Sequence, residues 1–137
     1  MKATKFPGQQ GSFNGVKAIT AATTLTAQDA NKIVAIDTTT ATAVTLPPVG
    51  PGNRGVRFHI QVRQLPGSGG HSINPNANDK IFASFAASTA AADNKDLYFG
   101  SDAAGTGDKV GDFIVLQSDG VDGYHQVAGQ GSFFREA

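Results

Sequence analysis

The chain lacks cysteine altogether, carries few charges and has no long apolar run. The absence of cysteine excludes disulfides, thiol nucleophiles and thiolate metal sites. No apolar stretch is long enough to cross a bilayer, and the first residues lack the apolar segment of a secretory signal. Charged residues make up only 16% and sum to zero, so no basic stripe favours nucleic-acid binding. We therefore expect a soluble protein, made in the cytoplasm, that binds neither nucleic acid nor membrane.

Small and turn-forming residues are what the sequence has in abundance. Its 137 residues include 17 glycines, and alanine, threonine and serine dominate much of the rest. Small and β-branched residues interrupted by turn formers favour strands joined by long loops over a helical bundle. The length fits a single domain. The composition therefore predicts one all-β domain.

The clearest strand signal covers residues 55–63, where apolar and polar residues alternate without a break. Successive strand side chains point to opposite sides of a sheet, so one side of this strand belongs in a core and the other in water. Proline-rich sequence before it and glycine-rich sequence after it are typical of a strand bounded by turns. The expected core side holds Val56, Phe58, Ile60 and Val62, and the expected wet side holds Arg57, His59, Gln61 and Arg63.

Shorter strands are expected before and after this central one. Residues 16–25 fit one or two short strands, and residues 26–29 fit a single helical turn with an acidic residue at its start. Residues 32–37 and 43–46, joined by a threonine-rich run, are interpreted as a hairpin-like pair. Later candidates, of which the second is expected to pair with the first, are Ser72–Asn74, Lys80–Phe82 and Leu97–Phe99.

A second strong signal lies in the last third of the chain. Residues 113–116 are apolar at four consecutive positions, which predicts a strand covered on both sides. Two Asp-Gly pairs follow within residues 118–123, and residues 124–127 are expected to return as the partner strand of a hairpin. Strands recurring about every 8–12 residues predict a single-domain sandwich or a β-tulip-like barrel with long Gly/Ala/Ser loops.

The first part of the chain is expected to be an extended arm. Residues 1–17 form this N-terminal arm in our prediction, and residues 18–137 form the all-β domain. The arm is polar and rich in glycine, yet it contains Phe6 and Phe13. Two interpretations follow from this pattern: a frayed terminus, or a segment that becomes ordered when its two phenylalanines dock on a partner.

No constellation of reactive side chains stands out, so we expect no enzyme activity, no cofactor and no metal. The three histidines lack the short spacing of metal ligands. Three aspartates share a glycine-containing loop without calcium-loop spacing, so we interpret them as solvated turn residues. There is no Gly-x-Ser-x-Gly elbow, and Glu136 is the sole glutamate. The histidines are His59, His71 and His125, and the aspartates are Asp102, Asp108 and Asp112.

The expected solvent-facing side of the central strand has two interpretations. In the first, it is an ordinary solvated sheet face whose arginines discourage pairing with other strands. In the second, it is a subunit or partner interface, where arginine is enriched.

In the order of its motifs, the chain resembles small β-rich structural proteins of tailed-phage virions, especially head decoration (cement) proteins. Each motif encodes mainly a turn or a core strand, and their order is the more specific part. A similar pattern occurs in tail-fibre-like proteins. The motifs are residues 24–32 (TLTAQDANK), 44–47 (VTLP), 57–62 (RFHIQV) and 110–120 (VGDFIVLQSDG), closed by Tyr124.

The resemblance implies a homotrimer on the exterior of an expanded capsid, where it clamps neighbouring copies of the major capsid protein. The arm would then bind the capsid through Phe6 and Phe13, and Arg57, His59 and Arg63 are expected at the trimer interface. The alternative is a tail-fibre or other virion appendage domain that binds a receptor or a glycan. Such domains usually follow a long shaft. The chain departs from decoration proteins of the lambda type in the extra loops at residues 83–108.

Overall fold

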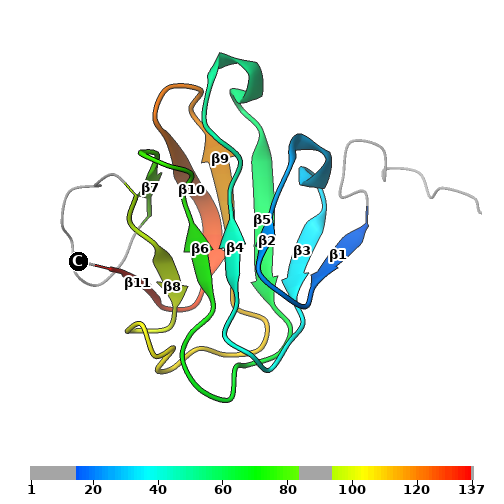
Figure 1. The fold of residues 1–137 in the computed structure, drawn as a ribbon, viewed down its shortest axis with the longest axis vertical. Coiled ribbons are helices and arrows are strands. Elements are labelled where there is room, and N and C mark those ends of the chain that lie inside the picture. Colours follow the sequence, from blue (N-terminus) through cyan, green and yellow to red (C-terminus); the bar gives the residue numbers. More distant parts are fainter. Residues whose placement is uncertain (1–14, 84–93, 137) are drawn as a thin grey trace, which may run out of the picture.

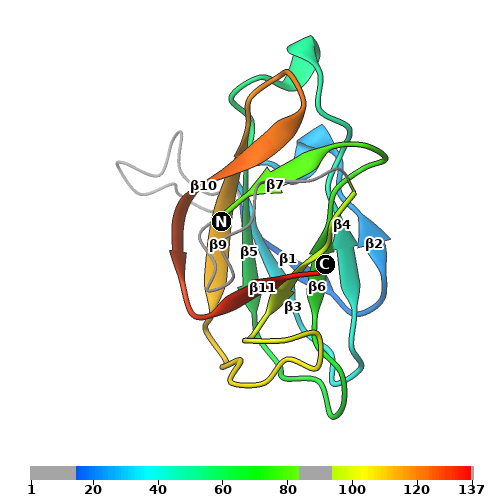
Figure 2. The ribbon, with the colours of Figure 1, turned by 90° about the vertical axis from the view of Figure 1, so that its left-hand side faces the viewer.

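The strands form two sheets that pack face to face, as the computed structural model shows for residues 15–83 and 94–136 (Figure 1). The sheets lie opposite each other and do not close into a barrel (Figure 2). The predicted all-β class is confirmed, and the architecture is the sandwich. The six-stranded sheet contains, in spatial order, β1 (Val16–Ile19), β3 (Ile33–Ile36), β5 (Arg57–Val62), β9 (Phe113–Ser118), β10 (Gly123–Gln130) and β7 (Lys80–Phe82). The five-stranded sheet contains β11 (Phe133–Arg135), β8 (Leu97–Phe99), β6 (Ser72–Asn74), β4 (Ala43–Thr45) and β2 (Thr23–Thr24).

The first half of the chain winds as a coil that visits the two sheets in turn. β1, β3 and β5 pair in parallel in one sheet, and β2, β4 and β6 pair in parallel in the other. The predicted hairpin between residues 32–37 and 43–46 is therefore wrong, because these segments belong to opposite sheets. Parallel strands need a crossover connection, and here the strand in the opposite sheet forms part of it.

The second half of the chain adds antiparallel strands to this coil. β9 pairs with β5, and β10 returns beside β9, so the predicted hairpin around residues 118–123 is confirmed. β7 pairs with β10 in parallel and not with β6, which instead has β8 as its antiparallel neighbour. The expected pairing of Lys80–Phe82 with Ser72–Asn74 is therefore wrong.

The core lies between the sheets and follows the alternation of β5. Phe58, Ile60 and Val62 are fully buried, whereas Arg57 is exposed and His59 is half-buried. Strands of the opposite sheet supply further fully buried side chains, among them Val44, Ile73 and Phe99. The predicted core side of the central strand is confirmed at Phe58, Ile60 and Val62, while Val56 is only partly buried.

β9 alternates in burial, although its sequence is apolar at consecutive positions. Ile114 and Leu116 are fully buried, whereas Phe113 and Val115 are half-buried on the solvent side of the sheet. The prediction that both sides of this strand are covered is therefore wrong. The solvent-side residues are partly shielded by neighbouring strands of the same sheet, including the ring of His59.

Three polar contacts hold the coil together and join it to the second half of the chain. The predicted helical turn is confirmed as the 3-10 helix η1 (Ala27–Asp29), and the N–H of Thr26 donates to Oδ2 of Asp29 at 2.9 Å. Lys17 of β1 donates to Oδ1 of the same carboxylate at 3.0 Å. Burial acts to raise the pKa of Asp29, but the Thr26 and Lys17 contacts outweigh it and lower the pKa. The third contact runs from the hydroxyl of Tyr124 to the carbonyl of Pro47, at 2.8 Å, and joins β10 to the end of β4.

Replacing Ile60 by alanine tests the role of β5 as the centre of the core. Ile60 is fully buried, so Ile60→Ala should lower the free energy of unfolding by about 2–5 kcal/mol through lost burial and a residual cavity. Chemical denaturation measures this change. The adjacent Gln61→Ala, on the solvent side, should cost less than about 1 kcal/mol. Equal losses in the two variants would contradict the assignment of the two sides.

Candidate interaction face

The solvent side of the six-stranded sheet is the candidate functional site. It forms because β5, β9 and β10 lie side by side, so that every second side chain of each strand projects away from the core. We call this surface the outer face. Its members on these strands are Arg57, His59, Gln61, Phe113, Val115, Gln117 and His125, and Val127 borders it at the irregular step between Gln126 and Ala128.

Stacked rings and side-chain hydrogen bonds order the outer face. The ring of His59 lies over that of Phe113 with centroids 4.9 Å apart, and its Nε2 lies 3.3 Å from Oε1 of Gln61. Burial lowers the pKa of His59, and the contact with Gln61 opposes this only in part. At the other end of β5, Nε of Arg57 donates to Oε1 of Gln117 at 2.8 Å. These side chains are held in place without a partner molecule.

An apolar stripe crosses the same side of the sheet. In register across the strands lie Val16, Ile33, His59 and Val115, from β1 to β9. Val16 is 65% exposed and Val127 of β10 is 44% exposed, while Ile33 and Val115 are half-buried. The outer face thus combines exposed apolar surface with arginine and aromatic groups, a composition typical of protein interfaces.

Of the three interface residues predicted from the sequence, two lie on the outer face and the third lies just beyond the end of β5. Arg57 and His59 both lie on the outer face. Arg63 lies just beyond the end of β5, is 68% exposed, and its Nε is 3.4 Å from Oδ2 of Asp37. The predicted capsid anchors Phe6 and Phe13 fall outside the described residues.

Sequence reasoning missed the contribution of β9 and β10 to this surface. The alternation of Phe113, Val115 and Gln117 was the available signal, but it was hidden by the buried apolar residues between them. The position of His125 depends on pairing with β7, where its ring stacks on Phe82 with centroids 4.3 Å apart. No short sequence pattern predicts that contact.

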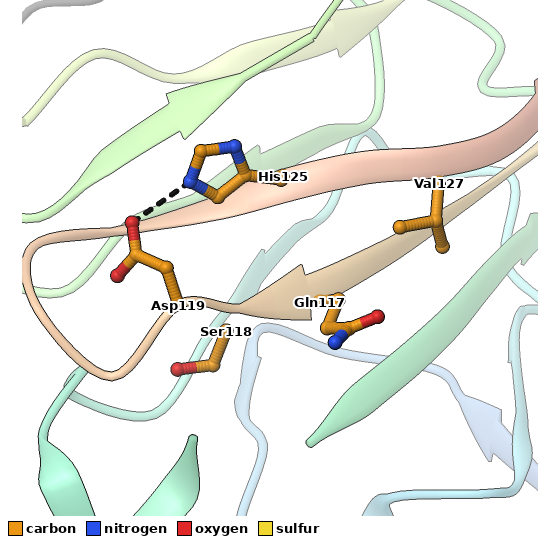
Figure 3. A pocket seen from close by; sticks show the side chains of 5 residues that line it. All are labelled: Gln117, Ser118, Asp119, His125 and Val127. Atoms are coloured by element: carbon orange, nitrogen blue, oxygen red, sulfur yellow. Dashed lines mark hydrogen bonds and ion pairs between the residues drawn. The ribbon is translucent and has the colours of Figure 1, made fainter. Parts of the chain in front are cut away.

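A shallow hollow of about 230 Å³ lies at the hairpin end of the outer face (Figure 3). Nε2 of His125 lies 2.8 Å from Oδ2 of Asp119, and the two side chains point toward one another. Oδ1 of Asp119 accepts three backbone N–H groups from the turn that follows. Burial acts to raise the pKa of Asp119, but these backbone bonds and His125 hold it well below its usual range. The hollow is lined by Gln117, Ser118, Asp119, His125 and Val127.

The three histidines remain apart. His71 is completely buried: its Nδ1 accepts the N–H of Thr42 at 3.1 Å, and its Nε2 contacts the carbonyl of Gln64 at 2.9 Å. His59 and His125 lie on the outer face instead. Within residues 15–83 and 94–136, no three histidine or acidic side chains gather to hold a metal ion.

Two aspartates of the loop before β9, Asp102 and Asp112, have local structural roles. Asp102 accepts hydrogen bonds from Thr106 and from the N–H of Ala104, as expected for a turn residue. Asp112 is buried and accepts the N–H of Lys109 at 2.9 Å, so its interpretation as a solvated residue is wrong. Asp108 is half-buried, and burial raises its pKa.

One pair of acidic residues comes together where β8 and β11 meet. The N–H of Asp96 donates to Oε1 of Glu136 at 3.2 Å, and the N–H of Glu136 donates to the carbonyl of Asp96 at 3.1 Å. Burial and the nearby Glu136 carboxylate raise the pKa of Asp96 to about 6, against a partial opposing effect of Lys95. These two bonds extend the pairing of β8 and β11 by one residue pair beyond Leu97 and Arg135.

Comparison with protein-family models, curated proteins and solved structures finds no match for this chain. In the part of the chain that the structure describes, no helix has the length and apolar character needed to cross a membrane. We therefore infer the function from the outer face itself and from the resemblance of the motifs.

The acidic pair gives the fold a pH dependence that can be measured. Because the pKa of Asp96 is raised from 3.8 to about 6, the folded state holds this proton more firmly than the unfolded state. Its contribution to stability is therefore present at acid pH and is lost as the pH rises from about 4 to about 6. Asp96→Asn should remove this loss and stabilise the protein at neutral pH.

Urea unfolding of the wild type and of Asp96→Asn, at about pH 4 and about pH 7, measures the effect. Glu136→Gln serves as a second variant, because it removes the like charge and should reduce the same pH dependence. An unchanged pH dependence in Asp96→Asn would show that another group is responsible.

Proposed function

We propose that this protein is a virion structural protein, a decoration protein that binds the outside of an expanded tailed-phage capsid as a homotrimer. The observation that carries the proposal is the outer face, an ordered surface on which apolar side chains lie beside stacked aromatic rings and arginine. The order of the sequence motifs supports the same assignment. In this role the protein acts by binding and performs no chemistry.

The outer face is suited to association between copies of the chain. A partner would cover the exposed Val16, and Arg57 is already held in place by its bond to Gln117. The ring stack with Phe113 holds His59 in a fixed position, so little side-chain entropy remains to be lost there on association. These features favour a pre-organised interface.

A trimer would also explain how a weakly binding arm can hold a capsid. In the proposal, the part of the predicted arm before β1, residues 1–14 of each copy, contacts the major capsid protein, with Phe6 and Phe13 as anchors. Three linked weak contacts can raise avidity by about 10²–10⁴ over a single contact. Capsid stabilisation then comes from multivalent clamping of neighbouring capsid subunits.

A tail-fibre or other virion appendage domain is the second candidate function. The observation that favours it is the hollow beside Asp119 and His125, which has no role in a simple clamp. Receptor or glycan binding at such a hollow would suit an appendage. Both candidates place the protein on the virion surface.

Reversing two charges tests the proposed trimer interface. Arg57→Glu combined with Arg63→Glu should dissociate the trimer, because like charges would be brought together at the threefold contact. Light scattering coupled to size exclusion should give three times the 14.1 kDa chain mass for the wild type and a single chain for the variant. The matched control is Arg54→Glu with Lys109→Glu, which makes the same charge change at exposed positions outside the outer face. If the variant keeps the wild-type mass, these arginines do not lie at the interface.

Truncating the arm tests the proposed capsid contact. Deletion of residues 1–14 keeps Gly15, whose carbonyl accepts the N–H of Ile33, so the sheet should remain intact. The truncated protein should stay trimeric but fail to sediment with emptied, expanded capsids.

Paired substitutions separate the phenylalanines from the rest of the arm. Phe6→Ser with Phe13→Ser should weaken capsid binding at least about tenfold, since two large apolar contacts are lost. Lys2→Ser with Lys5→Ser is the matched control and should have a smaller effect. Undiminished binding by the truncated protein would exclude the arm as the capsid contact.

A further inference from the structure

We propose that the hollow at the β9–β10 hairpin binds one pyranose unit of a neutral surface polysaccharide. This inference deepens and rests on the second candidate function, because it names the class of ligand for the same hollow, on a part of the outer face that the proposed trimer contact does not use. It depends on the geometry around Asp119 and His125 and not on the arm or on the number of subunits.

The hollow offers hydrogen-bonding groups of both kinds next to an apolar wall (Figure 3). Oδ2 of Asp119 accepts only the His125 contact within the described residues, so it has capacity to accept a hydroxyl. Among the contacts of the described chain, Nδ1 of His125 and Nε2 of Gln117 also have no hydrogen-bond partner. Val127 supplies the apolar wall and is 44% exposed.

These groups are held in position before any ligand arrives. Three backbone N–H groups fix Oδ1 of Asp119, and Asp119 in turn fixes one side of the His125 ring. The face of that ring stacks on Phe82 at 4.3 Å. Gln117 is held by its bond from Arg57. Binding would therefore cost little ordering of protein side chains.

Sugar chemistry matches this arrangement better than an anion or a metal ion does. A pyranose presents hydroxyls that both donate and accept, together with C–H groups that can pack against Val127 and the edge of the His125 ring. An anionic ligand would meet the Asp119 carboxylate, while the nearby Arg57 is already engaged by Gln117. A metal ion would find one carboxylate and one histidine, fewer than the usual set of ligands.

The size and shape of the hollow limit the expected affinity. A volume of about 230 Å³ is below the usual range for enclosed small-molecule sites, so the hollow can take only one sugar unit. A monosaccharide bound at so open a site should have a dissociation constant on the order of 1–10 mM. Useful binding to a surface polysaccharide would come from several copies acting together.

Two-dimensional amide NMR of the labelled full-length protein tests the proposal directly. The probes are D-glucose, D-galactose and N-acetyl-D-glucosamine, each added up to about 50 mM, with open-chain sorbitol as the matched polyol. At least one pyranose should cause saturable shifts confined to residues 117–127 and their neighbours on β7. Sorbitol should not.

Two variants make the result specific to the hollow. Val127→Asp places a charge on its apolar wall and should weaken binding at least tenfold. Val110→Asp makes the same change at a 64% exposed position in the loop before β9, outside the outer face, and should bind as the wild type does. The proposal is overturned by the absence of saturable shifts, by equal shifts with sorbitol, or by unchanged binding in Val127→Asp.

The subunit mass, measured on the same samples, separates this proposal from the proposed function. Saturable pyranose binding by a single-chain species would support the hollow as a sugar site and contradict the trimer. A trimer that binds no pyranose would support the proposed trimer and contradict the sugar site.

Discussion

The burial of one side of β5 is the constraint on which the rest of the structure depends. Phe58, Ile60 and Val62 are fully buried, and β5 is bonded to β3 on one side and to β9 on the other. Side chains alternate along a strand, so burying these three residues forces Arg57, His59 and Gln61 to the solvent side. The outer face is therefore a direct consequence of how the core is built.

The two halves of the chain contribute differently to that surface. The parallel coil supplies β1, β3 and β5, and with them the stripe that begins at Val16. The later hairpin adds β9 and β10, which bring the second ring stack and the hollow. The hydroxyl of Tyr124 then ties the hairpin to the coil at Pro47. A surface composed from both halves can combine an interface with a ligand site.

The sequence was informative where structure depends on neighbouring residues and uninformative where it depends on distant pairing. The alternation of β5, the turn at Asp29 and the hairpin around Asp119 all follow from local patterns. The placement of β3 and β4 in opposite sheets could not be predicted, because it depends on partners 26 and 29 residues further along, at His59 and Ile73. The hollow likewise needs the stacking of His125 on Phe82, which a parallel pairing brings together.

Electron cryomicroscopy of expanded, emptied capsids incubated with the purified protein is the most direct test of the central claim. We expect density on threefold or quasi-threefold axes of the capsid exterior, into which three copies fit with the β5 part of their outer faces turned toward one another. Capsids that remain bare at saturating protein concentration would contradict decoration. Trimeric density with the outer faces turned to solvent would contradict the proposed interface.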